Sequence, residues 1–222
     1  MRFGLSAFPP SFHPWMNTGT AAETVKMQSY RGLLSYAPTG GVRPELAESW
    51  TIEPDGSFLF KLREGAKFHN GDPVTADDVK ASYEGIAATK GAFMQAFFSQ
   101  LAGVEAVDPR HVRVRLKSPD ATLLNSLASY DSPIVSRRSL QETPDAPVGA
   151  GPYRVKELER GSWINLEAFA GFYKPGLPRS PSLRFGVYAD ENARMAALEA
   201  GDVDIIEYVP ANSMGAIERN PA

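Results

Sequence analysis

Apolar and polar residues alternate along several short segments of the chain, a pattern typical of half-buried strands. Residues 3–7 form a short apolar run, and apolar residues at helical spacing follow over about 22–34. Strand-like alternation then occurs in two pairs, at 50–62 around a Pro-Asp-Gly turn and at 104–116 around an Asp-Pro turn. Each pair predicts a β-hairpin, because turns favour these residues.

Two capped helices and four further strands are also predicted, most of them in the second half of the chain. Thr75 and Asp190 each precede a segment with helical apolar spacing and can cap its first N–H groups, and Gly201 is well placed to end the second helix. Strands are predicted at 153–158, 164–168, 183–188 and 203–206. The strand–helix–strand order over the last two predicts a parallel α/β crossover.

Composition narrows the class of protein. The chain has 222 residues, 43% of them hydrophobic and 22% charged, which is ordinary for a folded globular protein. The net charge of −3 argues against a nucleic-acid partner, and the lack of cysteine excludes disulfides and thiolate metal sites. No stretch approaches the roughly 20 apolar residues of a membrane helix. The first residues are expected to form a strand rather than a signal peptide, and the last are expected to mark the end of a fragment.

Candidate chemistry is sparse. The three histidines are too scattered to predict a metal site. Gly149 and Gly151 are followed by Pro152, which removes an N–H group that a phosphate loop needs, so a turn is favoured. The acidic pairs at 77–78 and at 202 and 204 are interpreted as helix capping or solvated charge, not as catalytic carboxylates. With no nucleophile-elbow motif either, the sequence predicts neither an enzyme nor a bound cofactor.

Several motifs together resemble the family 5 extracellular solute-binding proteins, the peptide/nickel-binding group of ABC import systems. They are PELAESW at 44–50, REGAKFHNGDPVTADDV at 63–79, GAGPY at 149–153 and AALEAGDVD at 196–204. Much of the long motif is turn chemistry, which specifies a scaffold rather than a ligand. The chain departs from the family at Ala150, where Thr is usual, at 170–173, and in the Phe-His-Pro-Trp loop at 12–15. These departures leave the ligand class open.

The resemblance implies an α/β fold of the periplasmic-binding-protein type (type II, cluster C). Lobe I is expected to begin at 1–44, to be interrupted by an inserted α+β subdomain at 45–147, and to continue, truncated, at 148–222. Its sheet should combine strands from both outer segments. Because family members are much longer, lobe II is expected to be absent from this chain.

The resemblance also implies a function. The chain is expected to be the substrate-binding component of an ABC importer, which captures an oligopeptide or dipeptide-like solute outside the cytoplasmic membrane and delivers it to a membrane permease. Its location would be the periplasm, or the cell surface as a lipoprotein in a Gram-positive envelope. Alternatives are a nickel chelate, an opine, a glycan or haem as ligand, and a role as sensor or receptor instead of in transport.

Three segments are expected to form the ligand surface by their positions in the family. They are the loop after the first strand (Phe12, His13, Trp15), the aromatic helix of the subdomain (Phe93, Met94, Phe97) and a strand end (Glu207, Tyr208, Val209). Because ligands gather at the carboxyl ends of strands in α/β sheets, Trp15 and Tyr208 are expected to be partly exposed at this edge.

Overall fold

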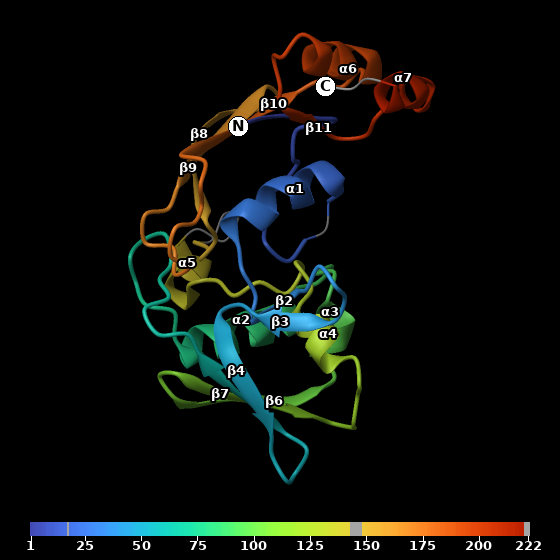
Figure 1. Cartoon of the computed structure of the whole chain (residues 1–222). Coiled ribbons are helices and arrows are strands. Elements are labelled where there is room, and N and C mark those ends of the chain that lie inside the picture. Colours follow the sequence, from blue (N-terminus) through green and yellow to red (C-terminus); the bar gives the residue numbers. More distant parts are fainter. Residues whose placement is uncertain (17, 143–147, 220–222) are drawn as a thin grey trace.

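The computed structural model describes residues 1–16, 18–142 and 148–219, and these residues form three β-sheets (Figure 1). The largest has the strand order β11-β1-β10-β9-β8. Its strands are β1 (Arg2–Leu5), β8 (Tyr153–Glu159), β9 (Trp163–Ala168), β10 (Ser182–Val187) and β11 (Ile205–Ile206). The N-terminal strand therefore lies inside the sheet, second from one edge, and the other strands all come from the last third of the chain.

Strand direction divides this sheet in two. β1 pairs in parallel with β10 and with β11, whereas β9 and β8 add in antiparallel fashion. Helix α6 (Glu191–Glu199) connects β10 to β11, which confirms the predicted parallel crossover, with β1 inserted between the two strands. The Asp190 side chain accepts a hydrogen bond from Ala193 N, as expected of the N-cap, and Gly201 has a φ of 75° just beyond the helix. Helix α1 (Thr20–Ser29) covers the opposite face (Figure 1).

A second sheet of order β4-β5-β7-β6 forms the lower part of the molecule in Figure 1. Both predicted hairpins are confirmed, as β4 (Ala47–Ile52) with β5 (Phe58–Leu62) and β6 (Leu101–Asp108) with β7 (His111–Leu116). The helices of this region are α2 (Ala76–Ala88), α3 (Gln95–Phe98), α4 (Leu123–Leu127) and α5 (Arg137–Glu142). The short strands β2 (Leu34–Tyr36) and β3 (Val42–Pro44) form the third sheet, and η1 (Ala211–Ser213) precedes α7 (Met214–Glu218).

Helix α1 is shorter than the apolar spacing predicts. It ends at Ser29, because Tyr30 is already extended with φ −120° and ψ 153°. Leu33 and Leu34, which the spacing placed on the helix, are instead buried with the residues of the second sheet. The expected end near residue 34 is therefore wrong, since these leucines pack against partners that lie far along the chain.

The buried apolar residues form two clusters. The smaller cluster packs α1 onto the five-stranded sheet and includes Leu5, Val25 and Phe185. The larger cluster surrounds α2 and the four-stranded sheet, and it also contains Trp15, Leu33 and Leu34 from the first segment. Residues before 45 thus contribute to both clusters, and the division into 1–44, 45–147 and 148–222 remains a prediction.

The GAGPY segment passes directly over the C-terminal end of α1. Gly151 N donates a hydrogen bond to Ser29 O at 2.9 Å. A Cβ atom added to Gly151 would lie 2.4 Å from Gln28 O, and one added to Gly149 would lie 2.2 Å from Ser29 O. Both glycines are therefore required by close backbone packing, and the turn predicted here has a structural role.

Glu45 joins the larger cluster to the segment that follows β9. Its carboxylate is buried, accepts hydrogen bonds from Lys174 Nζ at 2.7 Å and from Tyr173 OH, and lies 3.7 Å from Arg31 Nε. Burial by itself would raise the pKa of Glu45, but the hydrogen bonds from Lys174 and Tyr173 and the charge of Arg31 outweigh it and hold that pKa below its ordinary value of 4.5.

The lowered pKa of Glu45 predicts that the protein loses stability in acid. A lowered folded-state pKa stabilises the protein above the unfolded value, and the contribution disappears as the pH falls below about 4.5 and through the folded-state pKa. Glu45→Gln should lower stability at neutral pH and flatten the acid limb of a plot of unfolding free energy against pH. Glu64→Gln, at a side chain 84% exposed, should change neither. An unchanged acid limb in Glu45→Gln would contradict this assignment.

Candidate functional site

The carboxyl ends of the three parallel strands meet at one edge of the five-stranded sheet. β1, β10 and β11 end at Leu5, Val187 and Ile206, and the residues that follow leave the sheet together. In open α/β sheets this edge is where ligands bind. This edge is therefore the centre of the candidate site.

The buried carboxylate of Glu207 connects the segments at this edge through hydrogen bonds. It is 6% exposed, and its Oε2 accepts hydrogen bonds from Ser6 N at 2.8 Å and from Ser6 Oγ at 2.7 Å. Its Oε1 accepts a longer bond of 3.4 Å from Thr24 Oγ1 of α1. In this structure the carboxylate faces the loop after β1 and the helix, so it holds the edge in position. A direct contact with ligand stays a prediction.

Arg194 of α6 supports the same edge from the other face of the sheet. The side chain is 3% exposed; its Nε donates to Glu207 O at 2.7 Å and its Nη1 donates to Tyr188 O at 2.6 Å. A single guanidinium thus fixes the backbone after both β10 and β11. Our sequence reasoning missed this role, because an arginine within a helix is normally exposed and carries no sign of the two carbonyls that it meets.

Tyr208 is 59% exposed, which confirms the exposure expected of it. Its φ is 50°, uncommon for a residue with a side chain, and its hydroxyl donates to Thr20 Oγ1 at 2.6 Å. The ring is therefore presented to solvent beside the first turn of α1. Val209 follows it and is 38% exposed.

Trp15 contradicts the expectation of exposure. It is 3% exposed and belongs to the larger apolar cluster, and its Nε1 donates to Pro133 O at 3.4 Å. The indole lies against α2 at Gly85, where a Cβ atom would come within 2.4 Å of the ring. The loop after β1 is thus packed into the larger cluster through a recess that Gly85 provides on α2, and Trp15 does not belong to an exposed ligand wall.

The other aromatic candidates lie around this loop. His13 packs edge-on against Trp15 at 5.5 Å, and Phe93 N donates to Trp15 O at 3.0 Å, so the loop after β1 and the segment at Phe93 are brought together. Phe93 is 61% exposed, whereas Met94 and Phe97 are half-buried against the larger cluster. Phe12 packs on the smaller cluster. Ligand contact by these residues stays a prediction.

The described residues offer little reactive chemistry. No group of three His, Asp or Glu side chains among them could hold a metal ion. His69 Nε2 lies within hydrogen-bond distance of Gly151 O, at 2.9 Å, and burial lowers the pKa of this histidine. His111 Nδ1 lies 2.8 Å from Asp108 Oδ2. Within the same residues no helix is long and apolar enough to cross a membrane.

Comparison with curated proteins finds similarity along nearly the whole chain. It is 30% identical over 214 residues to the glutathione-binding protein GsiB of Escherichia coli strain K12, an alignment that covers 93% of this chain and 42% of GsiB. The chain thus spans less than half the length of the curated relatives that it matches.

Solved structures have the same fold. The binding protein AgaA from A. tumefaciens R10, in complex with agropinic acid, matches with a TM-score of 0.94 and 40% identity over 99% of this chain and 46% of AgaA. The oligopeptide-binding protein AppA of Bacillus subtilis, in complex with a nonapeptide, matches with a TM-score of 0.86 and 28% identity over 99% of this chain and 45% of AppA. The mixed α/β architecture is therefore that of the periplasmic binding proteins.

The family model described as "Bacterial extracellular solute-binding proteins, family 5 Middle" matches residues 41–222. This match includes the long motif at 63–79 and both later motifs, in the order in which they resemble the family. The chain belongs to the bacterial extracellular solute-binding proteins of family 5.

Proposed function

We propose that this chain supplies one wall of the ligand site in the substrate-binding component of an ABC importer. The protein captures a short peptide or peptide-like solute outside the cytoplasmic membrane, in the periplasm or as a lipoprotein on the cell surface, and delivers it to the permease. The observation that carries the proposal is the edge described above, where three parallel strands end beside the exposed ring of Tyr208. Membership of family 5 supports it.

The geometry suits a mechanism in which a second surface closes over the bound ligand. Tyr208 and Phe93 present their rings to solvent, and Glu207 and Arg194 hold the backbone next to Tyr208 through hydrogen bonds to Ser6 N and Glu207 O. Small-molecule sites normally bury 70–90% of a ligand's surface. A single open wall cannot do so, and binding energy would come from a second surface that closes over the ligand, which shifts an open–closed equilibrium.

A second candidate ligand is agropinic acid or a related opine. The 40% identity to a protein solved in complex with agropinic acid favours it over the other non-peptide ligands considered. The glutathione-binding and nonapeptide-binding relatives, at 30% and 28% identity, favour the peptide-like class. The residues that differ from the family around 12–15 lie next to the candidate surface, where they could alter ligand preference.

Mass spectrometry of the small molecule released from the gene product, purified as the cell makes it, tests the ligand class. A short peptide or a peptide-like derivative is the expected result. An opine would support the second candidate, and a glycan, haem or nickel chelate would overturn both. Uptake of the identified solute by cells that lack the gene should fall, whereas a sensor or receptor would leave uptake unchanged.

Variants of two exposed tyrosines test the surface itself. Tyr208→Ala should weaken binding of the identified solute at least tenfold by isothermal titration, because an aromatic anchor is lost. Tyr130→Ala, at a ring 46% exposed on the loop after α4, is the matched control and should bind as the unmodified protein does. Equal affinities in the two variants would remove Tyr208 from the proposed site.

A further inference from the structure

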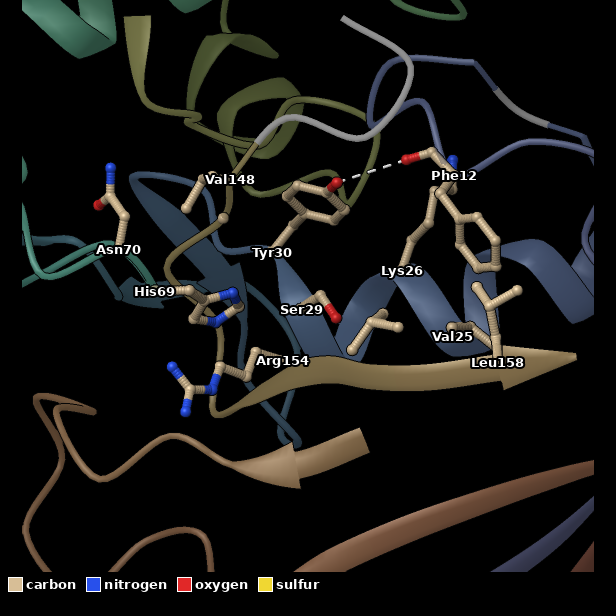
Figure 2. Close-up of a pocket in the computed structure, with 12 residues that line it drawn as sticks. Phe12, Val25, Lys26, Ser29, Tyr30, His69, Asn70, Val148, Arg154 and Leu158 are labelled. Atoms are coloured by element: carbon tan, nitrogen blue, oxygen red, sulfur yellow. Dashed lines mark hydrogen bonds between the residues drawn. The ribbon is translucent and has the colours of Figure 1, made fainter. Parts of the chain in front are cut away.

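A cavity of about 360 Å³ lies between α1, β8 and the loop at His69 and Asn70 (Figure 2). β8 and β11 are the opposite edge strands of the five-stranded sheet, so this cavity, beside β8, and Tyr208, which follows β11, lie towards opposite edges of the sheet. Its volume falls within the range of small-molecule sites.

The cavity wall is mostly apolar. Phe12, Val25, Val155 and Leu158 line it, and Figure 2 shows Phe12, Val25 and Leu158 gathered at one end. Val155 and Leu158 are 41% and 36% exposed, although they lie on a strand of a packed sheet. The exposed apolar area of β8 therefore opens into the cavity.

Ser29 contributes a polar atom that has no hydrogen-bond partner among the described residues. The residue is 8% exposed, and its Oγ has no hydrogen-bond partner within the part of the chain that the structure describes. Buried hydroxyls normally have a partner. Ser29 is the last residue of α1 and lines the cavity, so the hydroxyl is available to a molecule bound there.

The charged residues that line the cavity are basic, and each is paired with a carboxylate outside the lining. Lys26 and Arg154 line it, and none of its described lining residues is acidic. Lys26 is buried, and its Nζ already has two partners. It forms an ion pair with Glu23 Oε1 at 2.6 Å and donates a hydrogen bond to Met16 O at 2.6 Å. The Arg154 side chain is 48% exposed; its Nε bonds Glu167 at 2.7 Å, and its planar guanidinium carries further donors.

We propose that this cavity is a second binding site, for a small apolar monocarboxylate. The hydrocarbon part lies against Phe12, Val25 and Leu158, and the carboxylate accepts hydrogen bonds from Ser29 Oγ and from the Arg154 guanidinium. The ligand bridges the five-stranded sheet and the subdomain, because α1 and β8 belong to the first and the His69 loop to the second. The proposal is independent of the solute bound at the Tyr208 edge.

Isothermal titration of the 222-residue chain with 3-phenylpropionate tests the proposal, with 3-phenylpropanol as the neutral counterpart. Saturable binding of the carboxylate, at least tenfold tighter than that of the alcohol, is expected. Absence of saturable binding would overturn the site, and equal binding of the two compounds would overturn the proposed role of the carboxylate.

Three variants locate the binding. Leu158→Trp fills the apolar end and should weaken 3-phenylpropionate binding at least tenfold, whereas Ile52→Trp, at a residue 66% exposed outside this cavity, should leave it unchanged. Ser29→Ala should weaken binding several-fold without lowering the melting temperature, since the hydroxyl has no partner within the described ranges of the chain. A lower melting temperature in Ser29→Ala, or full binding by Leu158→Trp, would refute the assignment.

Discussion

Trp15→Ala is expected to lower the free energy of unfolding by about 3–5 kcal/mol, the range for removal of a large buried aromatic side chain. The indole is 3% exposed, fills the recess over Gly85 and donates a hydrogen bond to Pro133 O, so alanine would leave a cavity and an unpaired carbonyl. Urea denaturation followed by circular dichroism measures the change.

Tyr208→Ala is the contrasting variant. Its ring is 59% exposed, and its hydroxyl bonds only Thr20 Oγ1 among the described residues, so the expected loss is below about 1 kcal/mol. Similar losses in the two variants would show that burial does not separate the roles of these residues. A small loss in Trp15→Ala would mean that the loop at 12–16 is not packed into the larger cluster.

Gly151→Ala is expected to cost about 3 kcal/mol, at the upper end for an overpacked site. The added Cβ would lie 2.4 Å from Gln28 O, 2.5 Å from Ser29 C and 2.7 Å from Ser29 O. All three are backbone atoms at the end of α1, so no side-chain rotation relieves the contact. The hydrogen bond from Gly151 N to Ser29 O would be lost as the segments separate.

Gly103→Ala is the matched control, because a Cβ atom there meets nothing within 4 Å. It lies in β6, where alanine should change stability by less than about 1 kcal/mol. Equal melting temperatures for the two variants in differential scanning calorimetry would show that the GAGPY segment can move away from α1 without loss.

The regions around the five-stranded sheet and around the four-stranded sheet meet through a few specific groups rather than through a continuous core. The apolar residues fall into two clusters, and Glu45, the glycines at 149 and 151 and the loop at Trp15 connect them. The second binding site proposed above lies at this junction. Substitutions at the junction should therefore change how the Tyr208 edge and the Phe93 segment face each other. The candidate ligand surface, which these two segments form, should change as a result.

Much of the local structure could be predicted from neighbouring residues. The Pro-Asp-Gly turn joins β4 to β5, and Thr75 forms a capping box with Asp78 at the start of α2, with Thr75 N donating to Asp78 Oδ2 at 3.0 Å. These features depend on interactions within a few residues of the chain, which the order of residues determines directly. The family motifs work in the same way, because turn residues specify a scaffold wherever they occur.

The candidate site depended on contacts that no local pattern contains. Tyr208 is exposed and Trp15 is buried, although both are aromatic residues that follow strands of one sheet, because only Trp15 meets a glycine recess on α2. Glu207 faces Ser6, 201 residues away in the sequence, and Arg194 joins the ends of two strands. The sequence determined the family, the elements and their order. Tertiary packing decided the burial and direction of the side chains at the ligand edge, because these depend on which distant segments come to lie beside each residue.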